Sequence, residues 1–96
     1  MSSSTLSQIC DWYASQCNGE WEHGAGIRIE TLDNPGWSVE IDLARTNLEE
    51  AKLEKEYVEQ VDHTWYFAEI RDKRFYGAAD PKSLESVLGI FLGLLE

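Results

Sequence analysis

The most constraining feature of the chain is a pair of alternating segments, residues 26–32 ("GIRIETL") and 37–43 ("WSVEIDL"), joined by "DNPG" at 33–36. In both segments apolar and polar side chains alternate with the period of two that a β-strand with one buried face requires. Pro35 fixes φ at the first central position of a type II turn, and Gly36 tolerates the positive φ at the second. The pattern predicts an antiparallel hairpin whose buried face comprises Ile27, Ile29, Thr31, Trp37, Val39, Ile41 and Leu43.

Apolar residues at helical spacing predict a helix before this hairpin, capped by Ser4 or Thr5 and ended by Asn18-Gly19. The expected buried face of the helix comprises Leu6, Ile9, Cys10, Tyr13 and Cys17, with Trp12 at its rim. On one helix these two cysteines would lie about 10 Å apart, which is too far for a disulfide. We therefore expect free thiols that serve as small core residues in a reducing compartment.

A second hairpin is predicted by the aromatic segments at 64–70 ("TWYFAEI") and 74–79 ("RFYGAA"), which the charged "RDK" separates. The tryptophans Trp37 and Trp65 occupy strand positions and are interpreted as core or cross-strand packing residues. The segment 47–61 is ambiguous, because its composition favours a helix while its apolar residues also alternate with charged ones. We favour extended structure across part of it, with Ala51, Leu53, Tyr57 and Val61 on one side and Glu50, Lys52, Glu54 and Glu56 on the other.

The last element is predicted to be a helix, with Asp80 as its N-cap and Pro81 as its first residue. Its wide apolar face comprises Leu84, Val87, Leu88, Phe91, Leu92 and Leu95, and Ile90 and Leu94 nearly close the circle. A helix that is apolar nearly all round is buried on more than one side, here against the sheet and either the first helix or another subunit. A homodimer through this helix is therefore one expectation. Gly89 and Gly93 would let a neighbouring backbone approach closely.

The order of elements predicts an α+β fold, in which an antiparallel sheet of four to five strands carries the N-terminal and C-terminal helices on its apolar face. A chain of 96 residues is expected to form one domain, residues 1–96. The start of the chain has no pattern of a secretory signal, and the longest apolar run, 88–95, is shorter than the roughly 20 residues that a membrane span needs. We expect a cytoplasmic protein.

The charge of the chain restricts its partners. Eighteen acidic residues against eight basic ones leave a formal charge of −10. Such a chain repels nucleic acids and anionic membranes, so neither is expected as a partner, whereas basic proteins are attracted. The alternative is that the charge only keeps the protein soluble.

The stretch "CNGEWEHG" at 17–24 contains the residue types of a metal site or an acid–base pair. Glu20, Glu22 and His23 could join the distant His63, beside Asp62, in a small metal-binding, ligand-binding or hydrolytic site. No spacing typical of a metal site, no nucleophile motif and no phosphate-binding loop supports this reading. We therefore expect no enzyme activity, catalytic residue, metal or cofactor, and the hydrolytic domain remains the alternative.

Tryptophan and glutamate suggest a protein-binding surface instead. Trp21 lies between Glu20 and Glu22 in a short polar connection, where it either anchors an interface or plugs the end of the sheet. The glutamates of the middle segment form either a solvated face or a docking site for a basic partner. The candidate binding residues are Glu20, Trp21, Glu22, Glu49, Glu50, Glu54 and Glu56.

Most of the chain resembles the immunity protein 53 family of bacterial polymorphic toxin systems. The resemblance is carried by residues 12–43, above all "WYASQCNGEWEH" and "IETLDNPGWSVEIDL", and by residues 64–91. It implies a small cytoplasmic protein that binds a cognate toxin domain and blocks it without chemistry, and it brings no catalytic residues. A toxin that acts on nucleic acid, such as a nuclease, is typically basic. Residues 44–60 match less well, and because this region is rich in glutamate it is an attractive place for the protein to select its partner.

Overall fold

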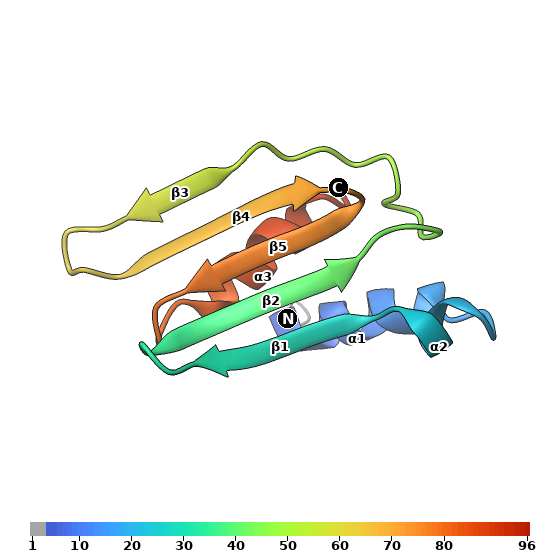
Figure 1. The fold of residues 1–96 in the computed structure, drawn as a ribbon, viewed down its shortest axis with the longest axis horizontal. Coiled ribbons are helices and arrows are strands. Elements are labelled where there is room, and N and C mark those ends of the chain that lie inside the picture. The colour runs from blue at the N-terminus through green and yellow to red at the C-terminus, as the bar shows by residue number, and fades with distance from the viewer. Residues whose placement is uncertain (1–3) are drawn as a thin grey trace.

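The computed structural model describes residues 4–96, which form one five-stranded antiparallel sheet with two longer helices on the same face (Figure 1). The strand order is β1-β2-β5-β4-β3. The elements are α1 (Thr5–Gln16), α2 (Trp21–Gly24), β1 (Ile27–Leu32), β2 (Gly36–Asp42), β3 (Glu56–Glu59), β4 (Trp65–Arg71), β5 (Arg74–Ala79) and α3 (Leu84–Gly93). The predicted α+β arrangement is confirmed.

The first hairpin has the predicted one-sided burial except at Thr31, which was expected on the buried face and is exposed near the end of β1. Ile29 pairs with Val39 and Ile27 with Ile41, and the two β2 residues are at most 1% exposed. The prediction of a type II turn is wrong, because Gly36 is the first residue of β2 and its φ is not positive. A glycine is needed there for another reason: a Cβ at this position would collide with the carbonyl oxygen of Ala79 on the neighbouring strand.

Replacing Gly36 with alanine is expected to lower the free energy of unfolding by about 1–3 kcal/mol, because the clash is with backbone that cannot rotate away. Urea titration followed by circular dichroism measures the change. The matched control is Gly89→Ala in α3, where a Cβ meets nothing within 4 Å. There alanine should stabilise the helix by about 0.5–1 kcal/mol. Equal urea midpoints for Gly36→Ala and the unmodified protein would contradict the assigned contact.

The second hairpin also forms as predicted, through a two-residue turn at Asp72 and Lys73. Their φ values of 52° and 59° are both positive, as in the type I′ turns whose twist suits a tight hairpin.

The middle segment is extended in part, as predicted. Pairing with β4 begins before β3, since the N–H of Ile70 donates to the carbonyl of Leu53 at 2.9 Å. The predicted alternation is wrong beyond Leu53: Val58 is the half-buried residue of β3, whereas Tyr57 is 55% and Val61 101% exposed. Val58 pairs with Tyr66, which packs against the core, so the inward positions shift by one along the segment.

Helix α1 is capped by Ser4, whose hydroxyl accepts the N–H of Ser7 at 3.1 Å. Its buried face is narrower than predicted and comprises Ile9 and Trp12. The prediction that both cysteines are core residues is wrong, because Cys10 and Cys17 are exposed free thiols. The predicted face also fails at Leu6, 64% exposed, and at Tyr13, 38% exposed. The helix turns Trp12, which was expected at the rim, into the core.

Helix α3 begins at Leu84, three residues later than predicted, and Ser83 occupies the N-cap position. The carboxylate of Asp80 instead accepts the N–H groups of Trp65 at 3.0 Å and Lys82 at 2.9 Å, which ties β4 to the turn before the helix. Val87, Leu88 and Phe91 are buried where α3 packs on β4, β5 and α1.

Within the chain, the close approach predicted at Gly89 and Gly93 does not occur, since both positions are open on their Cβ side. The close approach is at Gly77 of β5, where a Cβ would collide with Val87. The helix therefore sits near the sheet because a strand residue lacks a side chain.

Four aromatic rings link all the layers through the core. Trp21 packs edge-to-face on Trp12 with ring centroids 5.8 Å apart, Trp12 on Phe91 at 4.9 Å, and Phe91 on Phe75 at 5.4 Å. The Trp12 indole N–H donates to the side-chain oxygen of Asn47 at 2.9 Å, which secures the loop after β2. This ladder joins α2, α1, α3 and the sheet into one packed unit.

Candidate protein interface

The stretch at 17–24 folds as a self-contained connector between α1 and β1. The side-chain oxygen of Asn18 accepts the N–H groups of Glu20 and Trp21, both at 3.0 Å. The carboxylate of Glu22 accepts the N–H groups of Asn18 at 2.9 Å and Gly19 at 2.7 Å. These bonds turn the chain so that the Trp21 side chain points into the core, where it is 0% exposed. Of the two alternatives for Trp21, the structure shows the one in which the side chain is packed in the core.

The same hydrogen bonds decide which acidic side chains of this connector are free to contact a partner. Backbone N–H groups, its own and those of Asn18 and Gly19, hold the pKa of Glu22 below its usual range despite partial desolvation. Its charge therefore serves the local turn. Glu20 is exposed and its side chain caps nothing, so it remains available to a partner.

The alternative catalytic or metal site is not assembled. Figure 1 shows α2, with Glu22 and His23, at one end of the sheet, while the turn between β3 and β4, with His63, lies at the opposite end. Within residues 4–96 no three histidine, cysteine, aspartate or glutamate side chains are grouped so that they could hold a metal ion. The four residues of this alternative therefore share no site.

The acidic segment, residues 49–56, borders a hollow of about 450 Å³ beside β4 and the β4–β5 turn. Ala51, Leu53 and Ile70 supply its apolar lining, and the charged side chains around it are Glu49, Glu50, Lys52, Glu54, Asp72 and Lys73. The structure thus brings three of the predicted glutamates together, while Glu56 lies beyond them at the start of β3.

The glutamates of the acidic segment differ in whether they are bound by contacts within the chain. Glu49 accepts the N–H of Arg45 at 3.1 Å and pairs with the Lys73 ammonium at 3.5 Å. Glu50, Glu54 and Glu56 are exposed. An exposed carboxylate on a chain of this charge attracts cations over several ångströms at low salt.

The sheet face away from α1 and α3 carries a second group of candidates. Figure 1 shows both helices on the same side, so none of the described helices covers this open face. Tyr57 of β3 pairs with Phe67 of β4, and Glu59 with Trp65, on the side opposite the buried Ala68. The rings of Tyr57 and Trp65 stack with centroids 6.5 Å apart and planes 25° from parallel. We call Tyr57, Trp65 and Phe67 the aromatic cluster.

Sequence reasoning missed the aromatic cluster as a surface feature. Trp65 does make the cross-strand contact that its position suggested, but it lies outside the core. The available signal was the segment "WYFAEI", in which both alternating sets contain large apolar residues. Such a strand has more apolar surface than a single core face accounts for.

The other half of the open face is neutralised by its own ion pairs. Arg28 pairs with Glu40 at 3.1 Å, and the Arg74 guanidinium donates to Asp42 at 2.7 Å. Asp42 also accepts the N–H of Gly26 at 3.0 Å, which fixes the entry of β1. Hydrogen bonds to the Tyr76 hydroxyl and to Asp42 raise the pKa of Arg74. These ion pairs bridge β1, β2 and β5 on the open face.

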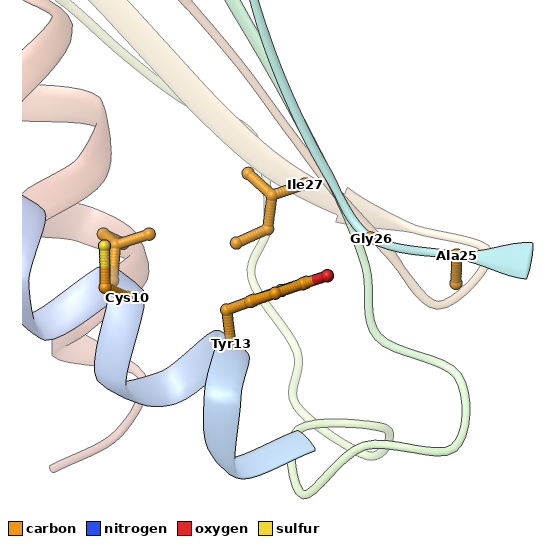
Figure 2. A pocket seen from close by; sticks show the side chains of 6 residues that line it. Cys10, Tyr13, Ala25, Gly26 and Ile27 are labelled. Atoms are coloured by element: carbon orange, nitrogen blue, oxygen red, sulfur yellow. The ribbon is translucent and has the colours of Figure 1, made fainter. Parts of the chain in front are cut away.

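A further pocket of about 390 Å³ lies between α1 and β1, lined by Ile9, Cys10, Tyr13, Ala25, Gly26 and Ile27. Figure 2 shows the Tyr13 ring reaching from α1 across the gap towards Gly26. The lining residues include no carboxylate, histidine or basic side chain, and the two with a titratable group are Cys10 and Tyr13.

Three comparisons with known proteins bear on the identity of the chain. The family model described as immunity protein 53 matches residues 6–96, which confirms the resemblance seen in the sequence. No curated protein and no solved structure matches the chain. Among the described residues, no helix has the length and apolar character that a membrane crossing demands.

Proposed function

The chain belongs to the immunity protein 53 family, and on that basis we propose that it binds a cognate bacterial toxin domain and neutralises it. Blocking is steric and electrostatic, so the protein makes and breaks no covalent bond. The family match over residues 6–96 is the observation that carries this proposal. A cytoplasmic location follows from the same role, because an immunity protein must meet its toxin inside the cell that it protects.

The charge distribution supports a basic toxin, for example a nuclease, as the partner. The chain has a formal charge of −10, and the acidic segment displays two exposed glutamates, Glu50 and Glu54, beside an apolar-lined hollow. This combination attracts a basic protein and then offers it apolar contact. Nucleic acid and anionic membranes would be repelled by the same charge. We place Glu49, Glu50, Glu54 and Glu56 at the edge of the docking region, with Glu20 as a peripheral contact.

The proposed function is tested by co-expression with the toxin domain that the neighbouring gene encodes. Cells that make both proteins should survive, and the two chains should co-purify at a fixed stoichiometry with the toxin's intact mass unchanged. An immunity protein of another family is the control and should give no protection. Equal killing with and without this chain would refute the proposal, as would inactivation of many toxin molecules by one molecule of it.

Light scattering on the free protein and on the complex tests the remaining prediction, a homodimer through α3. Part of this helix is already covered by α1 and the sheet, while Leu95 remains 40% exposed. A monomeric mass at micromolar concentration would reject the dimer and leave the proposed function intact.

A further inference from the structure

We propose that the aromatic cluster on the open sheet face anchors the toxin, by taking a lysine or arginine side chain over the Tyr57–Trp65 pair. This inference rests on the proposed function and names the surface and the chemistry that the partner must present. It differs from docking through the acidic segment alone, because it assigns most of the binding energy to rings on β3 and β4.

The exposure of the cluster is the first observation. The core lies on the helix side of the sheet, where Phe75 and Ala68 are 0% exposed, whereas Tyr57 on the open face is 55% exposed. Trp65 and Phe67 are only half-buried, and Trp65 stacks on Tyr57 at the edge of the sheet. Tyrosine and tryptophan dominate binding energy at protein interfaces, since they bury a large area at a small cost in conformational entropy.

The second observation is that this face already holds cations over its rings. The Lys55 ammonium lies 5.3 Å from the centroid of Phe67, and the Arg71 guanidinium 4.6 Å from that of Tyr76. Across residues 4–96 no lysine or arginine occupies the corresponding position over Tyr57 or Trp65. The stacked pair is therefore a cation–π platform whose cation is left for a partner to supply.

The third observation is the charge around the platform. Glu59 pairs with Trp65 across the strands, and its carboxylate is 3.5 Å from the Tyr57 hydroxyl. Beyond Trp65, a hollow of about 530 Å³ is lined by Asp62, which is exposed, by Asp80, which is buried, and by Lys82, among others. A guanidinium stacked on Trp65 would have the exposed carboxylates of Glu59 and Asp62 nearby, which is the environment that arginine prefers at interfaces.

Hydrogen bonds keep these two aspartates charged. The hydroxyl and N–H of Thr64 lower the pKa of Asp62. Burial acts to raise the pKa of Asp80, but hydrogen bonds from Ser83, Lys82 and Trp65 outweigh it and leave the pKa lowered. Both groups therefore stay ionised at neutral pH, and the exposed Asp62 contributes negative charge to the rim of the platform.

Anchoring by the aromatic cluster and electrostatic steering by the acidic segment predict different effects on the rate constants. A distant carboxylate changes how fast the partners meet, whereas a desolvated ring changes how long they stay together. We expect Tyr57→Ser to speed dissociation from the inactivated cognate toxin domain about 10- to 30-fold, with an association rate within about 2-fold of the unmodified protein. Because Tyr57 lies on an exposed edge strand, the melting temperature should change by less than about 3 °C.

A second variant and two controls complete the experiment. Glu59→Lys should also weaken binding about 10-fold, because it places a cation where the toxin's cation would sit. Leu6→Ser and Asp11→Lys make similar changes on exposed positions of α1, and they should leave both rate constants unchanged. Surface plasmon resonance gives the rates, and hydrogen exchange of the complex should show protection of 57–67 relative to the free protein.

The outcomes separate this inference from the function on which it rests. If the unmodified protein binds the toxin but Tyr57→Ser and Glu59→Lys bind equally well, the aromatic cluster is not the anchor and the immunity function stands. If the unmodified protein does not bind at all, the proposed function fails first. Equal losses in the variants and in the α1 controls would also overturn the assignment of this face.

Discussion

Replacing Trp21 with alanine is expected to lower the free energy of unfolding by about 3–5 kcal/mol. The indole is 0% exposed and packs against Trp12 and Tyr13, with ring centroids 5.8 and 5.7 Å apart. Its removal leaves a cavity at the end of the aromatic ladder that joins α2 to the rest of the core. Since domains of this size are stable by only about 5–15 kcal/mol, the melting temperature should fall by about 15 °C or more.

The matched control is Trp21→Phe, which keeps an aromatic ring in the core. Among the buried side-chain nitrogens and oxygens of residues 4–96, only the Trp21 indole nitrogen lacks a hydrogen-bond partner. Phenylalanine removes that unpaired donor, which offsets part of the lost packing, so this variant should cost clearly less than alanine. Differential scanning calorimetry measures both. An unchanged melting temperature in Trp21→Ala, combined with lost toxin affinity, would restore Trp21 to the interface.

Reversing Glu50, Glu54 and Glu56 to lysine is expected to slow association with the toxin about 10-fold or more at low ionic strength. Each replacement adds two units of charge, so the formal charge changes from −10 to −4. The dependence of the association rate on salt should flatten, because the screened attraction has been removed. Glu49 is left intact in this variant, since it holds Lys73 and the backbone of Arg45 and its loss would disturb the loop.

The control for this variant has the same net charge in a different place. Asp11, Glu85 and Glu96 are exposed on or next to the helices α1 and α3, and their reversal to lysine also leaves −4. Stopped-flow measurements at several salt concentrations compare the two triple variants. If both slow association equally, only the total charge steers the toxin, and the acidic segment is not the docking edge.

Local pattern in the sequence determined the two hairpins, the fold class and the family. The period-two alternation of β1 and β2 predicts which face of the hairpin is buried. Alternate residues of a strand point to opposite faces of the sheet, and neighbouring strands share those faces. The turn at 72–73 and the cap at Ser4 are likewise local, since the groups that they satisfy lie within a few residues. These features needed no knowledge of what packs on the sheet.

Only the tertiary structure decided which side chains those elements bury. The spacing along α1 allowed Cys10 and Tyr13 as well as Trp12 to face inward, and the position of Phe91 on α3 selected Trp12. The connector at 17–24 turned Trp21 into the core through hydrogen bonds that its composition did not reveal.

The candidate interface also has one part that the sequence predicts and one part that only the tertiary structure decides. The acidic segment is visible in the composition, because charge does not depend on folding. The aromatic cluster is not, because β4 carries large apolar residues on both faces and the sequence does not say which face the helices will cover. Both helices pack on one side, which leaves Tyr57 exposed and Trp65 and Phe67 half-buried on the open face. Burial is a property of pairs of elements, so it is settled when they dock and not by the pattern of either one alone.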